Sequence, residues 1–117
     1  MSTRAFIGIK NKEERISLFC RWDGDPEGIG LELKGFLSRQ ENWSPESIAL
    51  GLIKDPGINQ NFLSRERLFF TDEIHGTEDY VYIIDTKTKT LKCYEHEMYE
   101  TMEQCCIPSR IRKILNV

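Results

Sequence analysis

Hydrophobic and polar residues alternate in four stretches of the chain, and a period of two is typical of β-strands. The first two stretches, residues 5–9 and 15–22, are separated by a short polar segment of hairpin length. The other two, residues 80–84 and 91–95, flank a polar turn at residues 85–90. This pattern predicts two antiparallel hairpins, one at the start of the chain and one in its second half.

Helical spacing of apolar residues predicts helices outside these hairpins. Pro26 and the glycines around it end the second strand, and residues 28–37 then carry apolar side chains three and four positions apart. A Ser-Pro-Glu signal at residues 44–46 predicts the start of a second helix, which an Asp-Pro-Gly turn at residues 55–57 ends. A third helix is predicted after residue 109, with an apolar stripe formed by Ile111, Ile114 and Leu115.

These elements predict an α+β fold in which two hairpins build an antiparallel sheet of about four to six strands. Two to three helices are expected to pack against this sheet. The 117 residues suit a single domain spanning residues 1–117. Residues 58–76 have no clear period, and within them Leu68-Phe69-Phe70 fits either a short strand or a packed loop.

Charge and hydropathy narrow the class of partner. The net charge is −3, whereas general nucleic-acid binders are usually basic, so general nucleic-acid binding is not expected. No apolar run reaches the roughly 18–20 residues of a membrane span, and no signal-peptide core follows the first residues. We therefore expect no membrane association and a cytoplasmic location.

Four cysteines, at positions 20, 93, 105 and 106, are expected to be reduced in a cytoplasmic protein. They form no Cys-x-x-Cys pair, and the adjacent pair at 105–106 is a poor zinc clamp. A site built from Cys20, Cys93 and His96 is conceivable but has no spacing signature. Burial as small apolar residues is the simpler interpretation, and neither a metal nor a cofactor is predicted.

The most distinctive stretch is Cys20-Arg21-Trp22-Asp23-Gly24-Asp25-Pro26-Glu27-Gly28-Ile29-Gly30, called the 20–30 loop below. It combines a guanidinium, an aromatic ring and three carboxylates with three glycines. The helix macrodipole favours acidic residues at the start of the following helix, which explains Asp25 and Glu27 without a ligand. As ligand contacts, Arg21 suits a phosphate, Trp22 a base and Asp23 a ribose hydroxyl.

Further candidate contacts lie on the second hairpin and near the end of the chain. Tyr80 and Tyr82 share one face of the predicted sheet, where their rings either stack on a base or pack with their hydroxyls in water. Arg110 and Arg112, with Lys113, form the concentrated basic patch of the sequence. Cations late in a helix suit its dipole, but guanidinium groups also suit phosphate.

Residue patterns typical of catalysis are missing from the sequence. His75 and His96 have no neighbouring Ser or Cys in a recognisable nucleophile setting. Residues 28–30 lack the third glycine of a dinucleotide-binding motif, and no phosphate loop ending in Lys-Ser or Lys-Thr occurs. The sequence therefore predicts a binding protein and not an enzyme.

The start of the chain and the 20–30 loop resemble a group of small phage and prophage proteins. Those proteins open with a Ser-Thr-Arg strand, as at residues 2–4, and then carry a Cys-x-Trp-Asp-Gly-x-Pro element. The strand Glu78-Asp79-Tyr80-Val81-Tyr82 is similar to theirs as well. This chain differs from the group at Arg21, where a His is frequent, and at Asp25, where an aromatic residue is frequent.

Among such phage proteins, the Thoeris anti-defence sponges fit the predicted chemistry best. The resemblance implies a non-catalytic homo-oligomer in the host cytoplasm that binds a small anionic nucleotide, a cyclic ADP-ribose isomer, and withholds it from an immune effector. A second hypothesis belongs to another class of protein. In that hypothesis the chain is a phage inhibitor that binds a host defence protein, such as a CRISPR effector, through its acidic surface.

Overall fold

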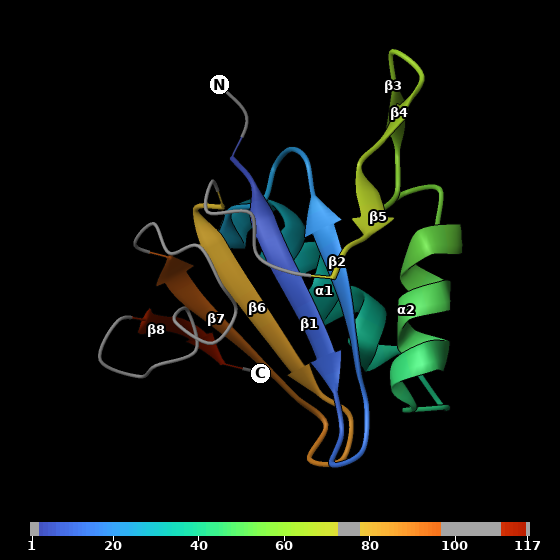
Figure 1. Ribbon diagram of the computed structural model, residues 1–117, viewed down its shortest axis with the longest axis vertical. Coiled ribbons are helices and arrows are strands. Elements are labelled where there is room, and N and C mark those ends of the chain that lie inside the picture. The colour runs from blue at the N-terminus through green and yellow to red at the C-terminus, as the bar shows by residue number, and fades with distance from the viewer. Residues whose placement is uncertain (1–2, 73–77, 97–110, 117) are drawn as a thin grey trace.

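The computed structural model describes residues 3–72, 78–96 and 111–116 (Figure 1). The fold is α+β, as predicted. The described residues form a sheet of six strands in the order β5-β2-β1-β6-β7-β8. These strands are β1 (Ala5–Lys10), β2 (Arg15–Cys20), β5 (Leu68–Phe70), β6 (Tyr80–Asp85), β7 (Thr90–His96) and β8 (Ile111–Asn116).

The remaining elements lie between β2 and β5 along the chain. A π-helical turn, η1 (Pro26–Gly30), leads directly into the helix α1 (Leu31–Ser38). The helix α2 (Pro45–Lys54) follows. A small separate hairpin, β3 (Asn61–Phe62) and β4 (Arg65–Glu66), projects beyond the start of β5 (Figure 1).

The second helix begins and ends at the residues that the sequence predicts. Ser44 is its N-cap, and the Ser44 hydroxyl accepts a hydrogen bond from the Ser47 backbone N–H at 3.1 Å. Pro45 occupies the first helical position, where its missing N–H is no loss. Asp55 caps the other end, and its carboxylate accepts the Gly57 N–H at 2.9 Å.

Both predicted hairpins are present, and they meet through a parallel pair of strands. β1 pairs antiparallel with β2, and β6 pairs antiparallel with β7. Between the hairpins, β1 and β6 run parallel, with Ala5 opposite Tyr80 and Lys10 opposite Asp85. The helices between them supply the long connection that a parallel pair needs. As a result, the turns of both hairpins lie at the same end of the sheet.

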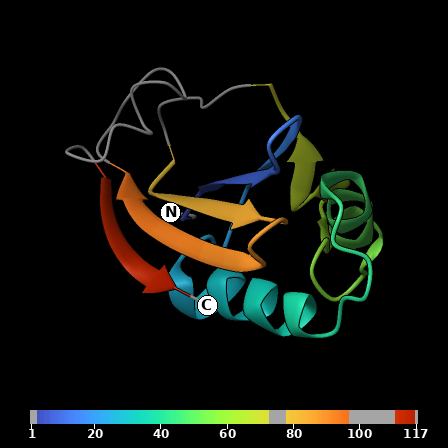
Figure 2. The ribbon, with the colours of Figure 1, turned by 90° about the horizontal axis from the view of Figure 1, so that it is seen from below.

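The two helices cover one face of the sheet (Figure 2). Figure 2 shows α1 along this face, and α2 contacts β1, β2 and β5. Side chains from β1, β2, β6 and β7 point into the layer between sheet and helices, where Ile7, Leu18, Leu33, Leu52 and Ile84 are fully buried. This layer is the main hydrophobic core.

The prediction of a third helix is wrong. Residues 111–116 form β8, which pairs antiparallel with β7 at one edge of the sheet. Apolar residues at positions 111, 114 and 115 fit a helix stripe, but a segment this short carries no decisive period. The open edge of β7 offers backbone hydrogen bonds to β-branched residues, and this tertiary context decides the conformation.

Candidate functional site

The 20–30 loop is held by Arg67, a residue outside it. The Arg67 side chain lies just before β5 and is almost completely buried, with 1% of its surface exposed. Its guanidinium donates to the backbone carbonyls of Trp22 at 3.0 Å, Asp23 at 3.1 Å and Ile58 at 3.1 Å. The Glu32 carboxylate pairs with the guanidinium through both oxygens: Oε1 lies 2.8 Å from Nη2, and Oε2 accepts a hydrogen bond from Nη1 at 3.1 Å. All three nitrogens of the guanidinium are therefore engaged by oxygen atoms.

The charge of Arg67 is stabilised inside the protein. Burial alone would lower the pKa of Arg67, but its contacts with Glu32 and Cys20 outweigh burial and hold that pKa above the ordinary arginine value. Burial raises the pKa of the Cys20 thiol to about 11, even though the Arg67 charge acts in the opposite direction. Cys20 is therefore a neutral donor, and its Sγ lies 3.1 Å from the Trp22 carbonyl oxygen.

Three consecutive carbonyls of the loop point into the protein. Arg67 binds the carbonyls of Trp22 and Asp23, and the Tyr82 hydroxyl donates to the carbonyl of Gly24 at 2.7 Å. The Gly24 N–H donates to the Thr3 carbonyl at 2.9 Å, which ties the loop to the start of β1. The backbone of the loop is thus part of the interior. The Asp23 and Glu27 side chains are exposed, whereas the Cys20 and Ile29 side chains are buried in the core.

Arg21 and Trp22 lie at the outer edge of the loop, beside β5 and the small β3–β4 hairpin. The Arg21 guanidinium stacks 4.1 Å from the centre of the Phe69 ring, and its Nε donates to the Glu66 carbonyl at 2.8 Å. Partial burial and the nearby Arg65 charge lower the pKa of Arg21. The half-buried Trp22 ring packs edge-on against the Phe62 ring, with 6.3 Å between the ring centres. Both predicted site residues therefore pack against the segment from β3 to β5, each on its own partner.

Tyr82 cannot stack on a base. Its side chain is fully buried in the core, and burial raises the pKa of the hydroxyl far above its ordinary value. The hydroxyl is not in water either, since it donates to the Gly24 carbonyl. Both expectations for the Tyr82 ring are therefore wrong, because its face of the sheet is covered by helices and the 20–30 loop.

Tyr80 is half-buried at the start of β6 and has acidic surroundings. Its pKa is raised by burial and then by the negative charges of Glu95, Asp25 and Asp79. These carboxylates disfavour a phosphate at this position. Arg112 lies on β8 opposite Glu95, whereas Arg110 lies outside the described residues.

Asp23 is exposed, and its backbone has a positive φ of 51°. Aspartate tolerates this left-handed conformation better than most residues. The turn at Asp23 directs its own carbonyl inward to Arg67 while the carboxylate stays in solvent. Among the described side chains, the predicted candidates thus lie in three places. Arg21, Trp22 and Asp23 lie on the outside of the loop, Tyr82 lies in the core, and Tyr80 lies at the start of β6.

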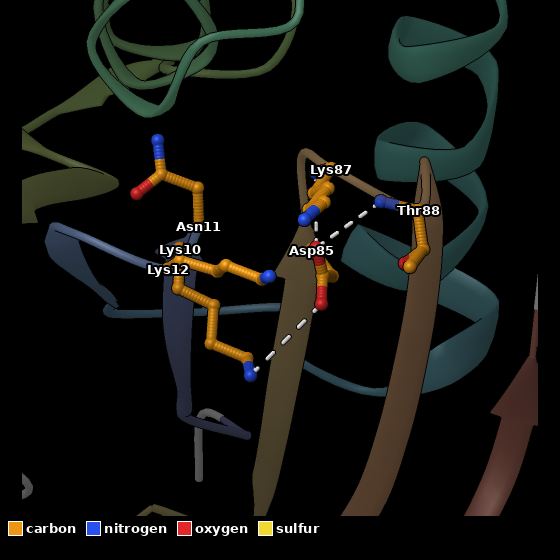
Figure 3. Close-up of a pocket in the computed structure, with 6 residues that line it drawn as sticks. All are labelled: Lys10, Asn11, Lys12, Asp85, Lys87 and Thr88. Carbon is orange, nitrogen blue, oxygen red and sulfur yellow. Dashed lines mark hydrogen bonds and ion pairs between the residues drawn. The ribbon is translucent and has the colours of Figure 1, made fainter.

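A pocket that the sequence did not predict lies where the two hairpin turns meet (Figure 3). This cavity of about 380 Å³ is called the turn pocket. It is lined by Lys10, Asn11, Lys12, Asp85, Lys87 and Thr88. In the sequence these lysines lie in two separate polar turns, and only the parallel pairing of β1 with β6 brings them together.

Comparisons of the chain with protein-family models, with curated proteins and with solved structures give no match. Within the part of the chain that the structure describes, no three His, Cys, Asp or Glu side chains are grouped to hold a metal ion. No helix in that part is long and apolar enough to cross a membrane.

Proposed function

We propose that the protein binds a small cyclic nucleotide signal, a cyclic ADP-ribose isomer, and sequesters it without cleaving it. The observation that carries the binding part is the preorganised 20–30 loop, and the state of three buried side chains supports the non-catalytic part. Cys20, Cys93 and Tyr82 are all fully buried. Burial raises the pKa of the Cys20 thiol to about 11 and that of the Cys93 thiol to about 12, so both are protonated at neutral pH. A nucleophilic thiol needs the opposite properties, exposure and a lowered pKa.

The 20–30 loop supports binding because it is preorganised. Its backbone is fixed by Arg67 and Tyr82, so a ligand that contacts the loop does not have to order it first. Asp23 and Glu27 are exposed and can accept hydrogen bonds from ribose hydroxyls. The resemblance of this loop to the phage sponges points to the same class of ligand and to a phage anti-defence role as a homo-oligomer.

The proposal predicts an intact nucleotide on the purified protein. Native mass spectrometry should detect its mass on the folded chain, and heat denaturation should release it unchanged. Added cyclic ADP-ribose isomer should raise the unfolding temperature, because a ligand at a hundred times its Kd stabilises the native state by about 2.7 kcal/mol.

Linear ADP-ribose, which has the same charged groups without the ring closure, is the matched control ligand. It should stabilise the protein less than the cyclic isomer does. Absence of any bound small molecule, together with no thermal shift from any cyclic isomer, would contradict the proposal. Recovery of a cleaved nucleotide would contradict its non-catalytic part.

The second candidate function, inhibition of a host defence protein, is favoured by the tip of the β3–β4 hairpin. Phe62 and Leu63 are 64% and 81% exposed there, and Leu63 and Ser64 both have a positive φ. Exposed apolar side chains on a strained turn are typical of contact sites for proteins. This function predicts a host protein that co-purifies with the wild type and with a Phe70→Ser control, but not with Phe62→Ser.

A further inference from the structure

The turn pocket is built by two turns that are fixed to each other. The Thr86 N–H and hydroxyl both bond to the Lys10 carbonyl, at 2.9 and 3.1 Å. Asn11 holds its own turn through its side-chain oxygen, which accepts the N–H groups of Glu13 and Glu14 at 2.8 and 2.9 Å. The lysines of the pocket therefore project from a rigid base (Figure 3).

The carboxylate of Asp85 is already engaged by its own turn. Its Oδ1 accepts the backbone N–H groups of Lys87 at 2.9 Å and Thr88 at 3.2 Å. These bonds and the nearby Lys10 charge outweigh burial and lower the pKa of Asp85. The Lys10 ammonium lies 4.0 Å from Asp85 Oδ2, the outer limit of an ion pair. Asp85 thus mainly holds the conformation of its turn and neutralises little of the positive charge of the pocket.

Two ammonium groups of the pocket lack a carboxylate partner. Among the described residues, neither Lys12 nor Lys87 has a carboxylate oxygen within 4.0 Å. Their amines point toward each other (Figure 3), and the proximity of Lys12 lowers the pKa of Lys87, although the more distant Asp85 charge acts in the opposite direction. The lining carries three ammonium groups against one carboxylate, although the whole chain has a net charge of −3. Like charges held this close favour an anion between them.

We propose that the turn pocket binds a phosphate group between Lys12 and Lys87. Lysine is a common phosphate ligand as a point charge. The Thr88 hydroxyl lines the pocket and lies 2.9 Å from the Thr90 hydroxyl, so it can donate to a phosphate while it accepts from Thr90. A cavity of about 380 Å³ accommodates a phosphate or a pyrophosphate. The phosphate comes either from a free inorganic anion or from the pyrophosphate of a nucleotide.

This site is distinct from the 20–30 loop. Ala5 and Tyr80 lie at the loop end of β1 and β6, while Lys10 and Asp85 lie at the pocket end. Five residue steps of about 3.3 Å each place the two ends about 17 Å apart. The phosphate site therefore does not depend on the proposed function, and each can fail alone.

The test is a titration of the full chain with pyrophosphate. Calorimetry measures the affinity, and the amide NMR signals of Lys87 and Thr88 report where pyrophosphate binds. The wild type should bind pyrophosphate with shifts at these amides. The double variant Lys12→Gln, Lys87→Gln should bind at least about tenfold more weakly. The matched control Lys34→Gln, Lys54→Gln removes two exposed helix lysines and should bind like the wild type.

Unliganded stability shows that the double variant is folded, and it should equal or exceed the wild-type stability because like charges have been removed. A second arm uses the cyclic ADP-ribose isomer. Weaker binding of this isomer by the double variant would place the nucleotide in the turn pocket and not at the 20–30 loop. Unchanged binding of the isomer assigns the pocket to free phosphate anions. Equal pyrophosphate binding by the wild type and the double variant, or no binding by either, would overturn the proposal.

Discussion

Replacing Arg67 with methionine is expected to lower the free energy of unfolding by about 3–5 kcal/mol, the range for breaking a buried ion pair from one side. Methionine is nearly as long, so the loss comes from polar groups that lose their partner. The carbonyls of Trp22, Asp23 and Ile58 lose their donor, and the Glu32 carboxylate loses its counter-ion. Urea unfolding followed by circular dichroism measures the change.

Arg65→Met is the matched control, because Arg65 is exposed and lies two residues away. Its effect should stay within about 0.5 kcal/mol, as for most surface substitutions. The Glu32 side chain is 32% exposed, so water can partly hydrate its carboxylate when Arg67 is missing. We therefore expect the stability loss for Arg67→Met near the lower end of its range. A loss for Arg67→Met no larger than that for Arg65→Met would refute the role assigned to Arg67.

Gly24→Ala is expected to destabilise the protein by about 2–3 kcal/mol, since overpacking against backbone atoms has few routes of relief. A Cβ at this position would lie 2.8 Å from the Arg4 carbonyl carbon and 2.9 Å from the Ala5 N. Both atoms belong to the chain entering β1, the strand next to the centre of the sheet. Thermal unfolding followed by circular dichroism measures the effect.

The same substitution at Gly35 should act in the opposite direction. A Cβ there meets only the flexible end of Arg39, at 3.6 Å, and Gly35 lies inside α1. Alanine is favoured over glycine in a helix, so Gly35→Ala should stabilise the protein by about 0.5–1 kcal/mol. Equal effects of the two substitutions would show that the close approach at Gly24 does not constrain the loop.

The elements with strong local signals were predictable from the sequence. Both hairpins follow from alternation, and α2 follows from Ser44 and Pro45 at its start and Asp55 at its end. The segment 111–116 was not predictable, because six residues with three apolar positions fit a helix or a strand equally well. Its pairing with β7 decides the conformation, and that pairing is a long-range property.

The sequence also marked the 20–30 loop as the unusual feature, but not the reason for it. Arg67 lies in a segment without a clear period, and nothing in the residues around it indicates a buried guanidinium. Alternation placed Tyr82 on a half-buried face, because it cannot show that helices and a loop cover that face. The turn pocket was missed since its lysines meet only through the parallel register of β1 and β6.

The claim that the 20–30 loop belongs to the folded core is tested most directly by native-state amide hydrogen exchange. The N–H groups of Arg21, Gly24 and Ile29 donate to the carbonyls of Arg67, Thr3 and Asp23 at 2.8–2.9 Å. These three amides should exchange as slowly as those in the centres of β1 and β6, because all should open only with global unfolding. Exchange at the rate of the exposed turn around Lys89 would contradict the account.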